Sequence, residues 1–160
     1  MGRETALVRG YFGIGVVNGK VSQNVGTLLR SAYAFGAAFV FTTGTRYQRQ
    51  CSDTSKAWRH MPLFHFPEVS DLLAYLPYDC RLVGIELDAR ARDLASAIHP
   101  ERACYLLGAE DHGLEPDVLA RCHEIFQVGG AARCLNVSVA GSIVLWDRQR
   151  KAIGTQESRP

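Results

Sequence analysis

Three separated segments place polar side chains beside glycine or uncharged backbone, where an apolar element begins or ends. They are Asn24-Val25-Gly26-Thr27-Leu28-Leu29-Arg30, Leu107-Gly108-Ala109-Glu110-Asp111-His112-Gly113-Leu114 and Leu135-Asn136-Val137-Ser138-Val139-Ala140. The first offers a cation, Arg30, on a helix face away from the apolar positions. The second puts Gly108 at the end of a strand, where backbone can approach a ligand closely. The third opens a helix, whose first amides are free to point at a ligand.

Two common nucleotide folds are excluded by spacing. Gly15-Val16-Val17-Asn18-Gly19-Lys20 is one residue short of a Walker A loop, and Val21 stands where that loop needs a metal-binding hydroxyl. Gly13 and Gly15 lack the third glycine of a dinucleotide fingerprint, whose place Asn18 occupies.

In this order, the three segments resemble the signature motifs of the SpoU (TrmH-like) family of SPOUT RNA methyltransferases, over about residues 10–148. The resemblance implies methyl transfer from S-adenosylmethionine to a ribose 2′-hydroxyl of RNA, without a metal. It also implies an α/β fold in which helices flank a parallel sheet, with a deep C-terminal trefoil knot. The implied assembly is a homodimer whose C-terminal helix packs near the partner's cofactor site.

The resemblance also implies roles for single residues. The catalytic set is Asn24, Arg30, Glu110 and Asn136, and the cofactor-binding set is Ile85, Gly108, Phe126, Val128, Cys134 and Leu135. A guanidinium is effectively always protonated, so Arg30 suits phosphate clamping or alkoxide stabilisation better than base catalysis. Glu110 is expected to hold either Arg30 or loop backbone, with Asp111 and His112 as loop surface.

The sequence departs from the family pattern at two places. Phe126-Gln127-Val128 stands where Ile-Pro-Met is common, and Cys134 replaces a serine. A thiol is the weaker hydrogen-bonding group. Because of these departures, one alternative function stays open: a knotted RNA-binding module that has lost its catalytic activity. A second alternative is a base-directed methyltransferase on the same fold. The presence of all four residues of the catalytic set argues against it, because the resemblance makes them the ribose-directed set.

The apolar pattern alternates strands with helices, which predicts a parallel sheet covered on both faces. Strands are expected at 11–17, 38–41, 81–87, 104–107 and 125–128. Helices are expected from Val25 to Phe35 with Gly36 as the stop, over 70–76 with Ser70 as N-cap, over 116–121 and over 136–150. Residues 43–62 are expected to form an irregular loop with a helical turn around 54–58.

The 160 residues predict a single domain, with 152–160 as a frayed tail. No apolar run reaches the roughly 20 residues of a membrane span, and the start of the chain lacks a signal-peptide pattern. The five cysteines are spread without a C-x-x-C pair, which favours reduced thiols over a disulfide framework or a zinc site. We therefore expect a cytoplasmic protein without a metal.

RNA is the expected partner, although a net charge of +2 is too small to indicate nucleic-acid binding alone. Basic residues interleaved with Tyr47 and Trp58 suit phosphate contact with base stacking, although solvated surface loops fit the charge pattern equally well. The candidates are Arg46, Arg49, Lys56 and Arg59. By analogy with other minimal members of the family, tRNA is expected rather than ribosomal RNA.

Overall fold

The computed structural model describes residues 10–48, 56–129 and 134–157, and its centre is a seven-stranded sheet. The strand order is β3-β2-β1-β6-β4-β7-β5, and every neighbouring pair is parallel. The strands are β1 (Tyr11–Val17), β2 (Phe39–Thr43), β3 (Leu63–Phe66), β4 (Arg81–Ile85), β5 (Arg92–Asp93), β6 (Arg102–Leu107) and β7 (Glu124–Gln127). The predicted parallel α/β architecture is confirmed.

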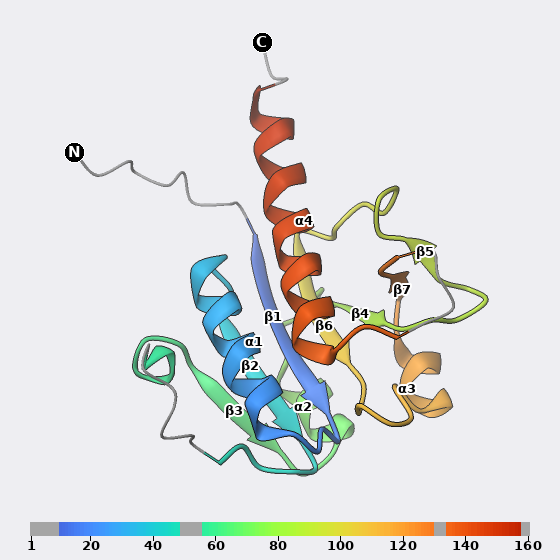
Figure 1. Ribbon diagram of the computed structural model, residues 1–160. Coiled ribbons are helices and arrows are strands. Elements are labelled where there is room, and N and C mark those ends of the chain that lie inside the picture. Colours follow the sequence, from blue (N-terminus) through green and yellow to red (C-terminus); the bar gives the residue numbers. More distant parts are fainter. Residues whose placement is uncertain (1–9, 49–55, 130–133, 158–160) are drawn as a thin grey trace.

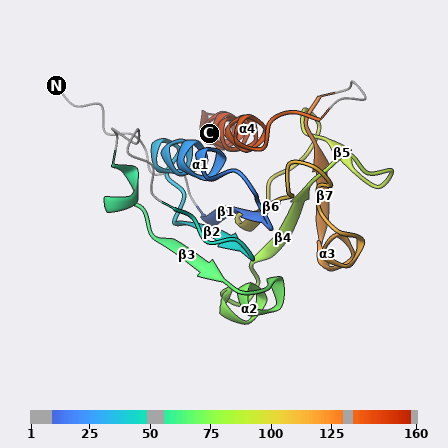
Figure 2. The same ribbon diagram turned by 60° about the horizontal axis from the view of Figure 1, so that its bottom comes forward.

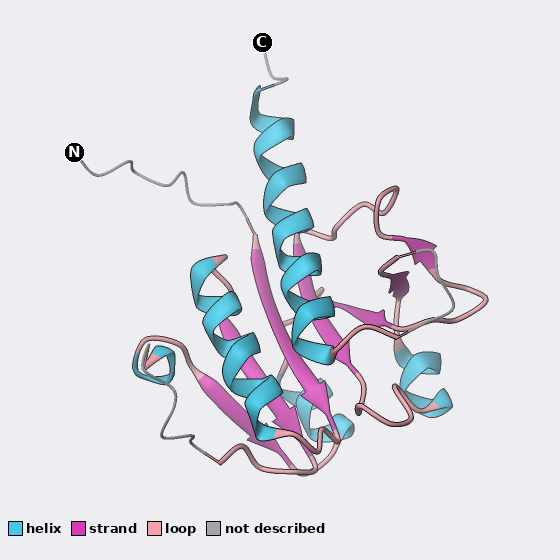
Figure 3. Cartoon of the chain, in the orientation of Figure 1, coloured by secondary structure: helices cyan, strands magenta, loops and turns pink. Residues whose placement is uncertain are grey.

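Helices cover both faces of this sheet (Figures 1 and 2). One face carries α1 (Ser22–Ala34) and α4 (Val137–Glu157), which lie side by side along β1. The other carries the short helices α2 (Val69–Tyr75) and α3 (Pro116–Arg121). A 3₁₀ turn, η1 (Ala57–Arg59), precedes β3, and Figure 3 shows how loops join the strand ends to the helices.

The core has two parts, one on each face of the sheet. Side chains alternate along a strand, so Ile14 and Val16 of β1 face α1 and α4. On the opposite face, a Cβ built on Gly13 would lie 2.2 Å from the ring of Phe39. Glycine therefore makes room there for aromatic packing, and Phe39 and Phe41 belong to the core beneath α2.

The predicted helices and strands are present, but several boundaries were wrong. Ser70 is not an N-cap: Glu68 takes that position and forms a capping box with Asp71. Strands β3 and β5 were missed, because β3 follows an irregular segment and β5 has only two residues. The predicted frayed tail is wrong for 152–157, which continue α4. The helical turn predicted around 54–58 corresponds to η1, which begins at Ala57. Residues 54 and 55 lie outside the described residues.

A close contact brings α4 against α1. A Cβ on Gly141 would lie 2.5 Å from a methyl carbon of Leu28 and 2.9 Å from one of Leu107, so a larger residue would separate the helices. The hydroxyls of Ser31 and Ser142 are 2.7 Å apart across the same interface. This packing fixes where the first turn of α4 lies relative to the start of α1.

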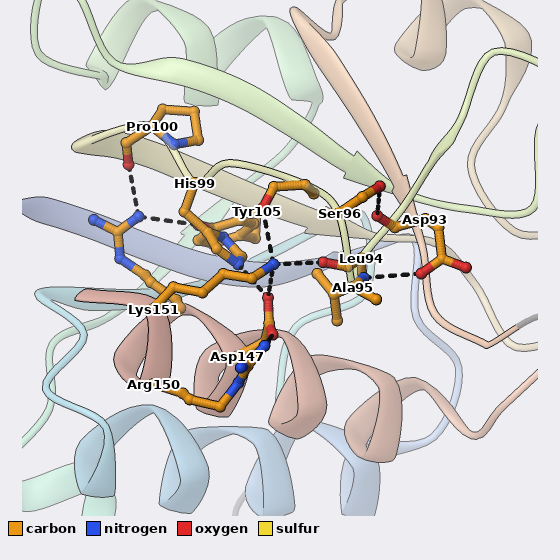
Figure 4. Close-up of polar contacts among 12 residues, drawn as sticks. Asp93, Leu94, Ala95, Ser96, His99, Pro100, Tyr105, Asp147, Arg150 and Lys151 are labelled. Carbon is orange, nitrogen blue, oxygen red and sulfur yellow. Dashed lines mark hydrogen bonds and ion pairs between the residues drawn. The ribbon is translucent and has the colours of Figure 1, made fainter. Parts of the chain in front are cut away.

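A buried polar cluster holds the middle of α4 against the segment that precedes β6 (Figure 4). We call His99, Tyr105, Asp147, Arg148 and Lys151 the buried cluster. His99 Nε2 lies 2.9 Å from the Asp147 carboxylate and Nδ1 lies 2.6 Å from the Tyr105 hydroxyl. Arg148 donates to that hydroxyl at 3.0 Å, and Lys151 donates to the carbonyls of Leu94 and Ala97. α4 is therefore anchored at two places along its length.

Candidate functional site

A cavity of about 290 Å³ opens at the carboxyl edge of β4, β6 and β7. Ligands bind at this edge in open parallel sheets. Its apolar wall includes Leu107, Val137 and Ala140. Five of the six predicted cofactor-binding residues line it: Ile85, Gly108, Val128, Cys134 and Leu135. The sheet thus brings together residues that are up to 50 positions apart in the chain, as Ile85 and Leu135 are.

Phe126, the sixth predicted residue, is not among the described residues that line the cavity. Its side chain is only 1% exposed, and its ring meets that of His99 edge-on at 5.5 Å between centroids. Its carbonyl accepts a hydrogen bond from the Glu86 amide at 3.1 Å. Phe126 therefore supports the cavity from the core.

Glu110 fastens the second motif to the loop before α1. Its carboxylate accepts hydrogen bonds from the Lys20 amide at 2.9 Å, the Val21 amide at 3.2 Å and the Asn24 side chain at 2.8 Å. Of the two predicted partners, Arg30 or loop backbone, Glu110 holds backbone. Burial alone would raise the pKa of Glu110, but these hydrogen bonds outweigh it and the pKa lies below its ordinary value. The group is therefore an anion at neutral pH.

Asn24 joins this carboxylate to the third motif. Its Oδ1 accepts a hydrogen bond from Asn136 Nδ2 at 2.9 Å, while its own amide donates to Glu110. Asn136 Oδ1 accepts from the Ser138 and Val139 amides at 2.9 and 3.3 Å, which confirms the predicted N-cap of α4. We call Asn24, Glu110 and Asn136 the site cluster. Three distant motifs therefore form one connected network at the cavity.

Arg30 lies farther along α1 than Asn24, on an exposed face of the helix. It does not line the cavity described above. The predicted separation from the apolar stripe is confirmed, because Val25, Leu28 and Leu29 are buried. Asn24 is buried as well, in the first turn, and the residue that precedes the helix is Val21.

Asp111 is more than loop surface. Its carboxylate pairs with the Lys20 ammonium, and His112 Nδ1 lies 2.6 Å from its other oxygen. The hydrogen bond from Lys20 is the main cause that lowers the pKa of Asp111 to about 2. Both acids of the second motif therefore hold the loop before α1, although Asp111 is about half exposed.

Glu86 is a site residue that the sequence reasoning missed. It lines the cavity, and its two carboxylate oxygens accept hydrogen bonds from the amides of Leu87 at 2.9 Å and Leu114 at 2.8 Å. Gly113, with a φ of +70°, passes so close that an added Cβ would lie 2.2 Å from Glu86 Oε2. The available signal was a carboxylate directly after a buried strand, at the edge where ligands bind.

Two of the four predicted RNA-binding residues, Arg46 and Arg59, line a second hollow, beside β2 and β3. Lys56 is exposed and precedes η1 in a left-handed conformation with a φ of +47°. Arg49 lies outside the described residues.

Within the described ranges, no group of three or more His, Cys, Asp or Glu residues is placed to hold a metal ion. No described helix combines the length and the apolar character that a membrane crossing needs.

The family can now be assigned. The model of the SpoU rRNA Methylase family matches residues 12–146. The chain belongs to this family. It is 32% identical over 143 residues to the tRNA (guanosine(18)-2′-O)-methyltransferase TARBP1 of Mus musculus, covering 81% of this chain and 9% of that protein. It is 28% identical over 140 residues to the 23S rRNA (guanosine-2′-O-)-methyltransferase RlmB of Acinetobacter baylyi, covering 82% of this chain and 56% of that protein. The chain thus spans less than two thirds of each relative.

Solved structures agree with the SpoU fold. AviRb, a SpoU methyltransferase from Streptomyces viridochromogenes, superposes with a TM-score of 0.82 at 19% identity, covering 92% of this chain and 62% of that chain. A structure described as giving insight into the 2-OH methylation of C/U34 on tRNA superposes with a TM-score of 0.76 at 25% identity. That match covers 91% of this chain and 98% of the other.

Proposed function

We propose that this SpoU-family protein transfers a methyl group from S-adenosylmethionine to a ribose 2′-hydroxyl of RNA. The site cluster carries the proposal: three motifs remote in sequence meet through Asn24, Glu110 and Asn136, and Glu110 lines the cavity beside them. The two relatives named above are 2′-O-methyltransferases, one of tRNA and one of ribosomal RNA. A base-directed reaction has no such support.

The cavity suits S-adenosylmethionine by its chemistry. Ile85, Leu107 and Ala140 give apolar surface for an adenine ring, and backbone at Gly108 comes close to the same space. Three carboxylates, those of Glu86, Glu110 and Asp111, also line it. The cofactor, which supplies a methyl group on a positively charged sulfonium, would be attracted by these anions. Cys134 lies on the wall, so its thiol replaces a hydroxyl at a cavity position.

The roles of the site residues follow from their bonds. Glu110 orients the start of α1 through the Lys20 and Val21 amides and through Asn24. Asn136 fixes the first turn of α4 against Asn24. Arg30, always cationic, lies on the exposed face of α1, where it would hold a phosphate or stabilise negative charge that develops on the attacking oxygen. The protein thus aligns the two reactants and adds a fixed positive charge.

We infer that the active form is a homodimer that packs through α1 and α4. An apolar hollow of about 390 Å³ lies between these helices, lined by Phe35, Val139, Ile143 and Trp146 among others. Val139 is 47% exposed and Trp146 is 53% exposed, as expected of surface awaiting an apolar partner. The neighbouring Leu135, 44% exposed, also lines the cofactor cavity, so such a dimer would cover this cavity's edge.

The trefoil knot is likewise a proposal. Its support is the path of the chain: β7 pairs with β4 and β5, and the chain then returns across the sheet to place α4 against α1. General topology rules make knots very rare, so family membership is the stronger support. Residues 130–133, between β7 and α4 in the sequence, lie outside the described residues.

We also propose that tRNA is the substrate and that the protein acts in the cytoplasm. A tRNA substrate has the support of TARBP1, the named relative with the higher identity. Cys80, Cys104, Cys122 and Cys134 are free thiols, which suits a reducing compartment.

Labelled methyl transfer to separated tRNA and ribosomal RNA fractions tests the activity, with Arg30→Ala in parallel. We expect label in the tRNA fraction, recovered as a 2′-O-methylnucleoside. Arg30→Ala should lower the rate about 100- to 1,000-fold, the usual cost of losing a group that stabilises transition-state charge. Cofactor binding and dimerisation should not change. Arg81→Ala, an exposed arginine at the start of β4, is the matched control.

Other outcomes would revise the proposal in different ways. Near-normal turnover of Arg30→Ala would refute the role of this residue. Label recovered on a base would establish base-directed chemistry. No transfer and no cofactor binding would favour the degenerate RNA-binding module.

A further inference from the structure

A second hollow, of about 570 Å³, lies between the segment after β2 and the start of β3. It is distinct from the cofactor cavity and shares no described lining residue with it. Six of its lining residues have basic or aromatic side chains: Arg46, Tyr47, Trp58, Arg59, His60 and His65. None of its described lining residues is acidic. Its size falls within the usual range of sites for small organic ligands, about 300–1,000 Å³.

The polar groups of this hollow are arranged in a definite way. The guanidinium of Arg59 lies 5.1 Å from the ring centroid of Trp58. Burial and the nearby charge of Arg46 lower the pKa of His65, whose Nδ1 lies 3.1 Å from the Thr42 hydroxyl. His65 is therefore neutral at pH 7, and the arginines carry the positive charge.

Helical spacing places Arg30 on the side of α1 that faces this hollow. A Cβ on Gly26 would lie 3.2 Å from the Tyr47 hydroxyl, and the ring of Tyr33 stacks on that of His60 with centroids 5.5 Å apart. Arg30 is four residues after Gly26 and three before Tyr33, so all three positions share one helix face. The start of the same helix carries Asn24 of the site cluster. α1 therefore runs from the methylation site to the hollow, with Arg30 between them.

We propose that this hollow binds an unpaired nucleotide of the RNA, a neighbour of the nucleotide that is methylated. The inference rests on the proposed function for the identity of the RNA substrate, and it adds a recognition site to it. Aromatic rings interleaved with arginines suit a stacked base together with its phosphate. Bases within a duplex are stacked on each other and cannot enter a side pocket, so the site selects single-stranded or looped RNA.

Tryptophan fluorescence tests the proposal directly. The chain has two tryptophans, Trp58 and Trp146, and only Trp58 lines the hollow. Addition of a short single-stranded oligoribonucleotide should quench part of the emission, whereas the same sequence in a duplex should not. Trp58→Phe, which keeps an aromatic ring for packing, should lose that part of the quenching.

Affinity measurements give a second readout. Arg59→Ala and His60→Ala change exposed residues, and each should weaken single-strand binding about tenfold. Arg59→Ala should also make the slope of log affinity against log salt concentration shallower by about one, because one phosphate contact is lost. S-adenosylmethionine binding should be unchanged in both. Arg81→Ala, at the start of the interior strand β4 and outside both hollows, should bind RNA as the wild type does.

The outcomes separate this inference from the proposed function. If the wild type methylates RNA and both variants bind and methylate it normally, the hollow is not an RNA site and the activity still stands. If the wild type transfers no methyl group but single strands still quench Trp58, the hollow is supported and the activity is not. Equal quenching by single strands and duplex would overturn the selection of unpaired RNA.

Discussion

The helix α4 is held at two places by polar clusters of opposite character. At its start, the site cluster joins Asn24, Glu110 and Asn136, and both Glu110 and Asn136 are exposed. Near its middle, the buried cluster encloses His99 and Asp147, whose side chains are each 5% exposed. The first cluster lies beside the cavity that Glu110 lines, whereas the second faces the segment before β6. Under the proposed function, the first cluster serves a ligand and the second serves the fold.

The hydrogen bonds explain how each cluster suits its place. Burial raises the pKa of Tyr105 to about 12, so its hydroxyl stays protonated and donates to His99 Nδ1. Burial also lowers the pKa of His99, although the hydrogen bond that its ring donates to Asp147 acts in the opposite direction. The neutral ring then donates from Nε2 to the carboxylate. A buried charge without partners is costly, and Asp147 has three donors. Glu110 of the site cluster also has three donors, but it is exposed, so solvent or a ligand can reach it as well.

The largest effect is expected from Asp147→Ala, in the buried cluster. It would leave Lys151 and His99 without their shared acceptor, and breaking a buried pair costs about 3–5 kcal/mol. The free energy of unfolding, from urea denaturation, should fall by that amount. Arg150→Ala removes a half-exposed partner of the same carboxylate and should cost less than about 1 kcal/mol. Similar losses in both variants would contradict the contrast between buried and exposed partners.

Glu110→Ala should give a smaller change, and in activity more than in stability. The variant removes an anionic acceptor from two amides and one side chain, and bonds of this kind contribute about 1.5–3 kcal/mol. The value of kcat/KM should therefore fall about 10- to 100-fold. Glu115→Ala, an exposed acid just beyond the second motif, is the control. A large loss of stability with normal kcat/KM would make Glu110 a residue of the fold, like Asp147.

The pH dependence of stability separates the two clusters further. The pKa of His99 is lowered in the folded state, mainly by burial. Below the ordinary histidine pKa of 6.5, the unfolded chain therefore binds more protons than the folded chain, and the free energy of unfolding falls as pH falls. Thermal unfolding on either side of that pH should show this trend, and His99→Gln should weaken it.

A second histidine provides the comparison for that experiment. The pKa of His65 is also lowered, by burial and by Arg46, although its ring is only half-buried. His65→Gln should therefore retain most of the pH trend. If His99→Gln showed the same trend as the wild type, another group would be responsible for it.

The residues of the site cluster could be named from the sequence, whereas those of the buried cluster could not. Asn24, Glu110 and Asn136 belong to three ordered motifs that resemble those of the SpoU family, and this resemblance singled them out. The fold class and most elements followed from apolar periodicity. His99 and Asp147 have no local signal: they are 48 residues apart, and only the packing of α4 on the sheet makes them partners.

Two further residues show the same division. Phe126 was predicted to bind the cofactor, and the alternation of side chains along β7 turns its ring into the core, so the ring itself does not line the cavity. Glu86 was missed because its role depends on a loop 28 residues away, at Leu114. The placement of Arg46 and Arg59 in one hollow likewise required the three-dimensional path of the chain from β2 to β3.

The smallest effect is expected from the exposed acid of the second motif. Asp111 pairs with Lys20, but both side chains are more than half exposed, and such pairs contribute little. Asp111→Ala should therefore lower kcat/KM by less than about fivefold, well below the loss in Glu110→Ala. Lys20→Ala should match it, because each variant removes the same pair while the Lys20 amide still donates to Glu110. Losses as large as that of Glu110→Ala would mean that Asp111 contacts a substrate itself, and the site cluster would then have to include it.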